Sequence, residues 1–351
     1  MKLQHLLDFI YQTILSWRPE RRFVMHTRPF GSKKSMISEV GLGTWQIGGF
    51  WGTVEDSTAM KILETAVEQG ITFFDTSDNY GNGRSESFIG KFLQNHKDSL
   101  YVATKQGRNP TPGWPDNFKP EVMVQHVENS LSRLKLEQID LLQLHCLPQE
   151  VLEDGTVFEV LRDLKKQGKI ADFGASVESV EQGLTCLKQE GLASLQVIFN
   201  IYRQKLITEL LGQAQQQGVS IIARIPLASG LLSGKMTKDT KFAETDHRNF
   251  NRDGAKFNVG ETFAGIPFET GVEITDELKA LKPEGMTLAQ MALRWVLDHD
   301  AVSVVIPGAS RPEQVISNAA ISEIPPLSPE LHKKLQNFYH EKVAQHIRGP
   351  Y

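Results

Sequence analysis

Eight short runs of hydrophobic residues recur along the chain, and segments with helical periodicity separate them. The runs are ISEVGLG (37–43), ITFFDT (71–76), LYVAT (100–104), IDLLQL (139–144), IADFGA (170–175), LQVIFN (195–200), VSIIARI (219–225) and VSVVIP (302–307). Runs of this length, rich in Val, Ile, Leu and Phe, are typical of strands buried on both faces. Between the first two runs, Met60, Leu63 and Val67 share one helical face,. The pattern therefore predicts strands that alternate with helices.

Glycines mark where several of the predicted helices should end. They stand at positions 70, 168, 191 and 218, each shortly before the next hydrophobic run,. Strands that alternate with helices form right-handed βαβ units and a parallel sheet. Eight such strands are the number that closes a (β/α)8 TIM barrel, an α/β fold.

An open, doubly wound sheet is the competing fold. It normally carries a G-x-G-x-x-G turn after its first strand. Here Gln46 stands where the third glycine should follow Gly41 and Gly43, and Glu86 stands there after Gly81 and Gly83. The missing fingerprint favours the barrel.

The connection between predicted strands 7 and 8 is far longer than the others, since it covers residues 226–301. Long irregular connections are usually lids or binding loops. Part of this insertion should be helical, with Thr287 as the N-cap. A further C-terminal helix is expected from Ser328 to about Ala344. We predict a single barrel domain over residues 30–351.

Residues 1–29 are predicted to be an N-terminal extension. Its apolar residues fall at helical spacing: Leu3, Leu6, Leu7, Ile10, Ile14 and Trp17. One interpretation is a short amphipathic helix that docks on the body of the protein or on a membrane surface. The other is an extension with no role in the chemistry, with the functional chain beginning near Met25.

Composition excludes several classes of function. The 351 residues carry a net charge of −4 and a pI near 6.2, which gives no general attraction to nucleic acid,. No apolar run approaches the roughly 18 residues of an integral membrane segment. Two cysteines do not form a disulfide framework and indicate the cytoplasm,. No metal-ligand spacing such as H-E-x-x-H or C-x-x-C is present, so no metal is expected. These features specify no oligomeric state.

Four polar residues follow three consecutive predicted strands. They are Asp75, Tyr80, Lys105 and His145. A titratable side chain at the end of a buried strand is poorly placed for core packing and well placed at a barrel mouth. Because three neighbouring strands end in this way, the pattern predicts an active site on one rim.

The four residue types together suit proton donation. Tyrosine has an ordinary pKa near 10 and is a weak acid at neutrality. An ammonium such as Lys105 should lower the pKa of Tyr80, with Asp75 as the counter-ion that keeps the lysine charged. His145 could donate a hydrogen bond to a carbonyl oxygen, and a positioned acid is worth roughly 10²–10⁴ in rate. The alternative is a structural ion pair with a surface tyrosine and a core histidine.

Several motifs in the same order resemble those of the aldo-keto reductases of the bacterial, NADPH-dependent type. They are GLGTWQ, FDTSDNYG-x-GRSE, LYVATK, DLLQLH, GKI-x-x-FGAS, the Pro-Leu-x-x-Gly-Leu-Leu-x-Gly-Lys run from Pro226, and VIPGASRPEQ. The resemblance extends from about Phe30 to the C-terminus. It implies a (β/α)8 barrel that binds a nicotinamide cofactor, NADP, in an extended pose without a Rossmann domain.

The resemblance also assigns roles to individual residues. Asp75, Tyr80, Lys105 and His145 match the catalytic tetrad, in which the tyrosine is the general acid and the nicotinamide delivers hydride. Ser176 and Gln196 match contacts to the nicotinamide carboxamide. Val177 stands where the family usually has Asn. Arg224 stands where an aromatic residue commonly stacks on the nicotinamide, and a guanidinium can also stack flat on a ring.

The last loop matches the site for the cofactor's phosphates. Residues 307–318 lead into a predicted helix, whose N-terminus favours anions. Arg311 would supply positive charge for NADPH, and Asn318 matches an adenine contact. Gly308 and Gln314 stand where the family often has Lys and Arg, which leaves NADH open as the cofactor. Three further residues match the loop along the pyrophosphate: Leu227, Ser229 and Lys235.

The expected function is reduction of an aldehyde or ketone, a small-molecule carbonyl substrate, to an alcohol. Trp45, Phe50 and Trp51 could line a substrate pocket, or they could be ordinary packing of a rim loop,. One alternative function is a nicotinamide-binding sensor or regulatory subunit with weak or no turnover. Another is a barrel isomerase or lyase that uses Lys105 as a Schiff base.

Overall fold

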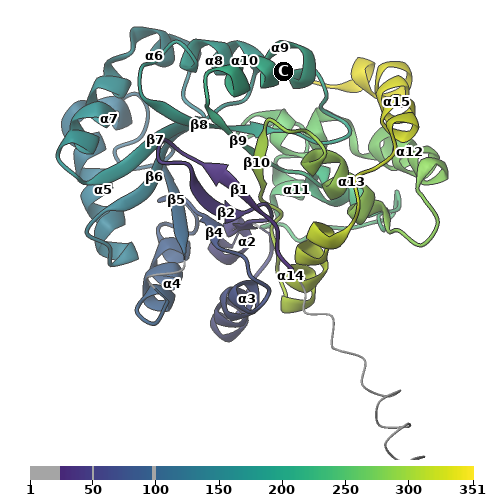
Figure 1. The fold of residues 1–351 in the computed structure, drawn as a ribbon, viewed down its shortest axis with the longest axis horizontal. Coiled ribbons are helices and arrows are strands. Elements are labelled where there is room, and N and C mark those ends of the chain that lie inside the picture. The colour runs from purple at the N-terminus through teal and green to yellow at the C-terminus, as the bar shows by residue number, and fades with distance from the viewer. Residues whose placement is uncertain (1–23, 50, 97–99) are drawn as a thin grey trace, which may run out of the picture.

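A computed structural model describes residues 24–49, 51–96 and 100–351 of the chain (Figure 1). Residues 1–23, which hold the predicted amphipathic helix, lie outside this part, as does Phe50.

Eight parallel strands form one continuous sheet. In spatial and chain order they are β3 (Leu42–Gly43), β4 (Phe73–Asp75), β5 (Tyr101–Gln106), β6 (Ile139–His145), β7 (Ile170–Ser176), β8 (Leu192–Ile198), β9 (Ser220–Arg224) and β10 (Val302–Val305). Parallel bridges from Val40 to Val305 and from Gly43 to Gly308 join the first strand to the last. The sheet is therefore closed, and the predicted barrel is confirmed.

The predicted first strand, over residues 37–43, is divided in two. Strand β2 (Ser35–Ser38) pairs antiparallel with β1 (Thr27–Phe30), whereas β3 (Leu42–Gly43) and the bridge at Val40 join the barrel. Glu39 lies between the two pieces, and its carboxylate accepts hydrogen bonds from Arg28 (2.9 Å) and Ser322 (2.9 Å). These contacts hold the chain at the point where it turns from the hairpin into the barrel.

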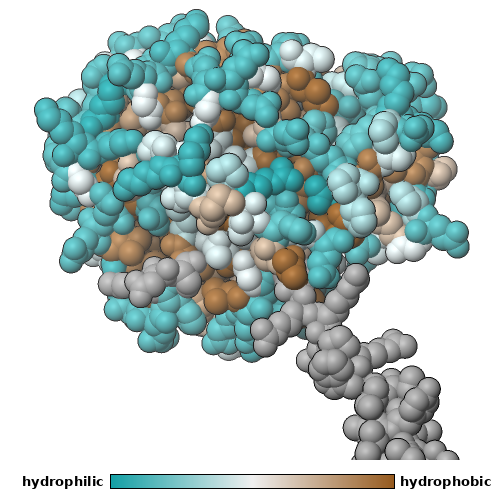
Figure 2. Space-filling view, viewed as in Figure 1, coloured by the Kyte–Doolittle hydropathy of each residue, from teal (hydrophilic) through white to brown (hydrophobic). Residues whose placement is uncertain are grey.

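The β1–β2 hairpin covers the N-terminal end of the barrel, where it crosses the centre of Figure 1. The ring of Phe30 lies 5.2 Å from that of Phe73 and 5.3 Å from that of Tyr101. Apolar side chains fill the barrel beneath it: Phe30, Ile37, Phe73, Ala103, Leu141, Ile222, Val304 and Ile306. Hydrophilic side chains cover most of the face that Figure 2 shows. The open end of the barrel is therefore the opposite one, where the strands finish.

Helices surround the barrel and bury a second apolar layer against it. They are α3 (Asp56–Glu68), α4 (Arg84–Leu93), α5 (Pro120–Leu134), α6 (Gln149–Asp154), α7 (Thr156–Lys166), α8 (Val180–Cys186), α9 (Leu206–Glu209), α10 (Leu211–Gln216), α13 (Leu288–Leu297) and α14 (Pro312–Ala319). The glycines predicted to end helices have left-handed φ angles, 72° at Gly70 and 69° at Gly218 for example. Within the described ranges, every helix is too short or too polar to span a lipid bilayer.

The long insertion lies between β9 and β10, as predicted. It holds η3 (Ala228–Ser233), α11 (His247–Phe250), η4 (Val259–Glu261), η5 (Phe263–Gly265), α12 (Phe268–Leu278), η6 (Lys279–Leu281) and α13. Thr287 caps α13 in a capping box with Gln290. The C-terminal helix is α15 (Pro329–Phe338), capped by Ser328 and continued by a π-turn over Tyr339–Val343.

Two helical glycines make a matched test of the packing. A Cβ on Gly90 of α4 would overlap the carbonyl oxygen of Arg133, whereas a Cβ on exposed Gly212 of α10 would meet nothing within 4 Å. We expect Gly90→Ala to lower the free energy of unfolding by about 1–3 kcal/mol through overpacking. Gly212→Ala should raise it by about 0.5–1 kcal/mol, since alanine restricts the unfolded chain. Urea unfolding measures both, and an equal effect of the two substitutions would contradict the packing described.

Candidate active site

The four polar residues predicted to share a rim lie together at the carboxyl ends of neighbouring strands. Asp75 is the last residue of β4, Lys105 lies near the end of β5, and His145 is the last residue of β6. Tyr80 lies in the turn between β4 and α4, where its N–H donates to the carbonyl oxygen of Ser77. Parallel pairing of β4, β5 and β6 aligns these ends at one edge.

Lys105 is at the centre of the group. Its Nζ donates to Asp75 Oδ2 at 2.7 Å, to the carbonyl oxygen of Thr76 at 2.8 Å and to the hydroxyl of Tyr80 at 3.2 Å. The residue is 1% exposed and Asp75 is 2% exposed. The ammonium therefore has a full set of acceptors in a site that excludes water.

The electrostatics of the tyrosine differ from the prediction. Burial lowers the pKa of Lys105, but the charge of Asp75 and the contact with Tyr80 outweigh it, so the pKa lies above its ordinary value. Burial raises the pKa of Tyr80, and the Lys105 ammonium offsets only part of this rise. The predicted net lowering was wrong, because the cost of burying a phenolate exceeds the attraction of a lysine already paired with Asp75.

His145 lies beside this pair as a neutral imidazole. Burial, together with the charges of Arg108, Lys105 and Arg224, holds its pKa well below the ordinary 6.5. Its ring is edge-on to Tyr80, with centroids 5.8 Å apart. Its Nδ1 lies 3.0 Å from the hydroxyl of Ser77. A neutral imidazole with one N–H can donate to a ligand oxygen without adding charge.

The second carboxylate oxygen of Asp75 is held by two amides. Gln196 Nε2 donates to Asp75 Oδ1 at 2.7 Å and Gln143 Nε2 at 3.2 Å, while Ser176 donates to Gln196 at 3.5 Å. Gln143 was missed in the sequence, although a polar residue inside the run IDLLQL was a visible signal. Ser176 and Gln196, predicted to contact a carboxamide, are thus joined to the Asp75–Lys105 pair.

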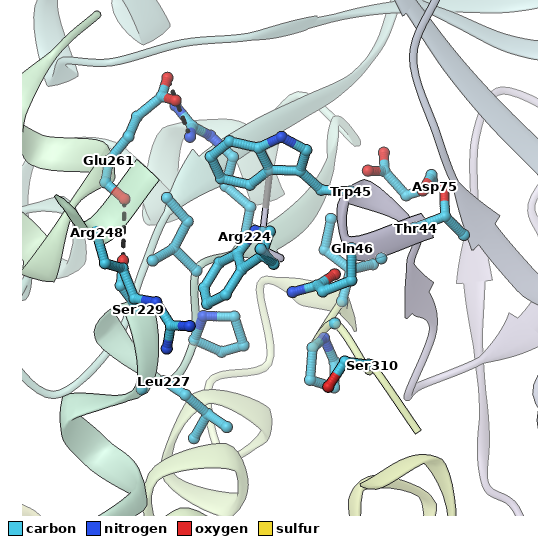
Figure 3. Close-up of a pocket in the computed structure, with 18 of the residues that line it drawn as sticks. Thr44, Trp45, Gln46, Asp75, Arg224, Leu227, Ser229, Arg248, Glu261 and Ser310 are labelled. Carbon is cyan, nitrogen blue, oxygen red and sulfur yellow. Dashed lines mark hydrogen bonds and ion pairs between the residues drawn. The ribbon is translucent and has the colours of Figure 1, made fainter. Parts of the chain in front are cut away.

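A cavity of about 730 Å³ opens above the four residues (Figure 3). Asp75, Tyr80 and His145 reach its wall, whereas Lys105 lies behind them. Eight of the predicted cofactor residues line it: Gln196, Arg224, Leu227, Ser229, Lys235, Gly308, Arg311 and Gln314. Ser176 and Asn318 are buried and do not form part of its wall. Trp45 and Trp51 also line the cavity, and the prediction for Phe50 lies outside the described residues.

The aromatic side of the cavity is built partly from the long insertion. Trp45 stacks against Tyr80 with centroids 6.0 Å apart. The ring of His247 lies 4.6 Å from Trp45, and the guanidinium of Arg248 lies 4.6 Å from the centroid of Trp51. The insertion was predicted to be a binding loop, but no periodic pattern identified which of its residues reach the site.

Gly308 lies against the side chain of Gln46. A Cβ at this position would overlap the side-chain amide of Gln46, which lines the same cavity (Figure 3). The Oε1 atom of Gln46 is buried without a hydrogen-bond partner. A larger residue at this position would therefore require the flexible side chain of Gln46 to move.

The family model described as "Aldo/keto reductase family" matches residues 39–340. This chain belongs to the aldo/keto reductase family. It is 32% identical over 295 residues to the aldo-keto reductase YhdN of Bacillus subtilis (strain 168), which is 82% of this chain and 85% of that protein. Because it belongs to this family, the chain is an oxidoreductase.

Solved structures agree with the fold of this aldo-keto reductase. The holo form of aldo-keto reductase AKR11C1 from Bacillus halodurans has a TM-score of 0.74 at 26% identity, covering 90% of this chain and 96% of its own. An aldo-keto reductase from Klebsiella pneumoniae in complex with NADPH has a TM-score of 0.67 at 26% identity, covering 90% and 95%.

Arg224 of this aldo-keto reductase is held by a charge from the insertion. Its guanidinium lies 3.4 Å from Glu261 Oε1 (Figure 3). It also donates to the carbonyl oxygen of Val177 at 3.3 Å. Burial raises the pKa of Glu261, but Arg108 and Arg224 outweigh it and bring the pKa to about 2. Glu261 therefore stays ionised and ties the insertion to the ends of β5 and β9.

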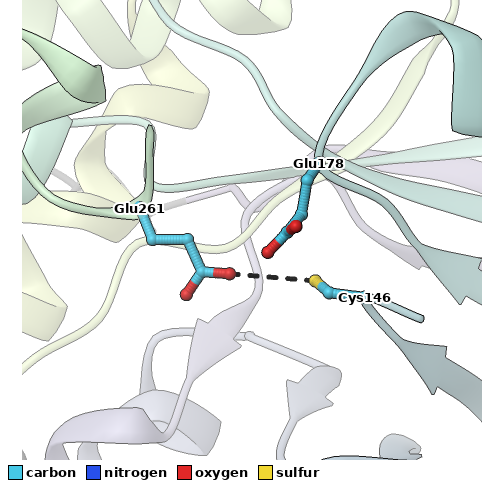
Figure 4. A group of neighbouring side chains, drawn as sticks. All are labelled: Cys146, Glu178 and Glu261. Carbon is cyan, nitrogen blue, oxygen red and sulfur yellow. Dashed lines mark hydrogen bonds between the residues drawn. The ribbon is translucent and has the colours of Figure 1, made fainter. Parts of the chain in front are cut away.

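Cys146, Glu178 and Glu261 converge at the edge of this network (Figure 4). Their ligand atoms lie within 4.8 Å of one another, an arrangement that could hold a metal ion. Both carboxylates already pair with Arg108, at 2.6 Å and 3.0 Å. Burial raises the pKa of the Cys146 thiol to about 11, so it is not a thiolate at neutrality. The donor set suits an ion-pair network better than a metal centre.

The buried pair gives a stability prediction for this aldo-keto reductase. Lys105→Met leaves the Asp75 carboxylate buried without its cation, so we expect a loss of about 3–5 kcal/mol in the free energy of unfolding. Lys105→Met combined with Asp75→Asn removes both charges and should recover a large part of that loss. Chemical unfolding of both variants provides the measurement. Equal stability of the single and double variants would show that the two charges do not depend on each other.

Proposed function

We propose that this aldo-keto reductase reduces an aldehyde or ketone to an alcohol with NADPH, with Tyr80 as the general acid. The observation that carries the proposal is the 3.2 Å contact between the Tyr80 hydroxyl and the buried Lys105 ammonium at the base of the cavity. The solved relative from Klebsiella pneumoniae in complex with NADPH supports the choice of cofactor.

The residues of the cavity fit a dinucleotide. Lys235, Arg248 and Arg311 place positive charge along its wall, and Arg311 directly precedes α14, whose N-terminus favours phosphate,. The unpartnered Gln46 Oε1 could accept from a ribose hydroxyl. We propose that the cofactor is held by the predicted residues that line the cavity, namely Gln196, Arg224, Leu227, Ser229, Lys235, Gly308, Arg311 and Gln314. The proposal also keeps Ser176 and Asn318, which are buried behind the wall and would need a small movement to reach the cofactor. When bound, the nicotinamide supplies the hydride.

The proton is proposed to come from Tyr80. Hydride adds to the carbonyl carbon, the carbonyl oxygen takes the hydroxyl proton of Tyr80, and the resulting phenolate is reprotonated from solvent. Lys105 stabilises the phenolate charge as it forms, and Asp75 keeps Lys105 charged and in place. His145, neutral and adjacent, orients the carbonyl oxygen by donating a hydrogen bond.

The substrate side of the cavity is proposed to be aromatic. Trp45 and Trp51 would enclose the apolar part of a small carbonyl compound, while Tyr80 and His145 bind its oxygen,. We also propose that residues 30–351 act as one barrel domain. The two cysteines are unpaired, which is consistent with the cytoplasm as the compartment,.

A Schiff-base reaction through Lys105 is disfavoured by the geometry. The lysine side chain has no exposed area, and its Nζ already donates to three acceptors. Burial lowers the pKa of Lys105, but its contacts, with Asp75 first among them, outweigh burial, so the pKa lies above its ordinary value. The amine is therefore protonated and not nucleophilic.

Tyr80→Phe tests the proposal. We expect kcat with NADPH and reactive aldehydes to fall about 10²–10⁴-fold, because the acid is lost. The Kd for NADPH, measured by fluorescence, should stay within a few fold of wild type, since the ring still packs against Trp45. Trp114→Phe, on an exposed loop outside the cavity, is the control and should change neither value.

Undiminished turnover in Tyr80→Phe would remove the tyrosine from the mechanism. Tight NADPH binding by the wild-type chain without turnover of any carbonyl compound would instead favour a cofactor-sensing role.

A further inference from the structure

A chain of buried polar side chains leads from His145 away from the cavity. The hydroxyl of Ser77 lies 3.0 Å from His145 Nδ1, and it donates to Asp78 Oδ1 at 3.3 Å. The other oxygen, Asp78 Oδ2, lies 4.0 Å from His126 Nδ1. Ser77, Asp78 and His126 are 0%, 1% and 6% exposed. The proposed reduction assigns no role to any of these three residues.

Two atoms in this row of buried polar side chains face each other, and neither has a hydrogen-bond partner. They are Asp78 Oδ2 and His126 Nδ1. His126 Nε2 lies 3.3 Å from the carbonyl oxygen of Thr111, which can only accept, so Nε2 carries a hydrogen,. Burial lowers the pKa of His126, so the ring is neutral. Its Nδ1 therefore carries a lone pair and no hydrogen. A carboxylate facing a lone pair is unfavourable, whereas a protonated Asp78 can point its O–H at Nδ1.

The surroundings of Asp78 favour the protonated form of its carboxyl group. The charged and titratable groups that face it are Glu86 on α4 and His126 and Arg133 on α5. Burial raises the pKa of Asp78 to about 7, the charge of Glu86 adds to the rise, and Arg133 and the hydrogen bond from Ser77 oppose it. Glu86 is itself bound to Arg133 at 2.6 Å and to Thr104 at 2.5 Å. Arg133 is therefore largely neutralised by Glu86.

The hydroxyl of Ser77 has one proton and several places to donate it. Its acceptors are Asp78 Oδ1, Asn79 Oδ1 at 2.9 Å, the carbonyl oxygen of Lys105 at 3.3 Å, and His145 Nδ1 when that atom carries no hydrogen. Of these groups only Asp78 changes its acceptor strength near neutral pH, because His145 stays neutral. The charge on Asp78 therefore decides how strongly the hydroxyl is drawn away from His145.

We propose that Asp78 is a positioning residue that sets the tautomer of His145 through Ser77. With Asp78 protonated, Ser77 donates to His145 Nδ1, and the hydrogen of the imidazole lies on Nε2. With Asp78 ionised, Ser77 turns its hydroxyl to the carboxylate and accepts a hydrogen bond from Nδ1–H of His145. Nε2 of His145 then has a lone pair and no hydrogen. Asp78 loses its proton to solvent. His145 breaks its Nε2–H bond and forms an Nδ1–H bond by exchange with solvent in the cavity that it lines, so the number of protons on the imidazole does not change.

The consequence for the reaction rests on the proposed function. A carbonyl oxygen needs a donor, so only the tautomer with hydrogen on Nε2 can orient it. Activity should therefore be present below the pKa of Asp78 and fall by about tenfold per pH unit above it. Loss of the Tyr80 proton lies at higher pH, because burial raises the pKa of the phenol.

The test measures the tautomer of His145 directly, by the 15N chemical shifts of its ring in labelled enzyme between pH 5.5 and 9. In wild type we expect the hydrogen to move from Nε2 to Nδ1 as pH rises through about 7, the pKa of Asp78. Asp78→Asn cannot ionise, so the tautomer and the activity should lose this pH dependence. Glu86→Gln removes a charge that raises the pKa of Asp78, so both transitions should move to lower pH.

The outcomes separate the inference from the proposed function. A single His145 tautomer across the whole range in wild type, or an unchanged transition in Asp78→Asn, would overturn the inference. If Glu86→Gln does not fold, Ser77→Ala replaces it and should abolish the transition by breaking the chain. A tautomer transition that follows Asp78 in a protein without carbonyl turnover would support the inference and contradict the proposed function.

Discussion

The buried ion pair between Lys105 and Asp75 is the interaction on which the rest of the site depends. Removing two charges from water costs several kcal/mol each, and the cost is offset only when the geometry is close and the remaining hydrogen-bonding groups are satisfied. Here the pair is 2.7 Å apart. Gln143 and Gln196 hold the second oxygen of Asp75, and the Thr76 carbonyl oxygen and Tyr80 complete the partners of Lys105. The barrel supplies these groups from strands β4, β5, β6 and β8 and from the turn that follows β4.

The same pair explains how a tyrosine can be poised without being ionised. Burial alone would make the phenolate of Tyr80 very unfavourable, and the adjacent ammonium offsets part of that cost. The phenol thus remains protonated at rest and has a compensating charge beside it if it gives up its proton. The wall above it has a second charge network, in which Glu261 from the long insertion holds Arg108 and Arg224. The insertion is thereby fixed to the barrel mouth by ionic contacts as well as by the aromatic contacts of Trp45 and Trp51.

Much of this architecture was predictable because it follows from local rules. Continuous apolar runs identified the strands, glycines identified several helix ends, and the position of Asp75, Lys105 and His145 at strand ends predicted that they meet. The division of the first strand at Glu39 depends on contacts with Arg28 and Ser322, far apart in the chain, and no local pattern carries that information. The direction of the Tyr80 pKa depends on a balance between burial and charge that only coordinates define. Likewise, the close contact of Gly308 is with Gln46, a residue over 250 positions away in the chain.

The most direct test of the account is a crystal structure of the chain with NADP and a bound carbonyl compound. The account predicts that the carbonyl oxygen lies within hydrogen-bond distance, about 2.6–3.2 Å, of both the Tyr80 hydroxyl and His145 Nε2. The nicotinamide C4 should lie about 3–3.5 Å from the carbonyl carbon, with the Lys105–Asp75 pair intact behind the phenol. A carbonyl oxygen bound away from Tyr80, with the nicotinamide on another part of the cavity, would contradict it.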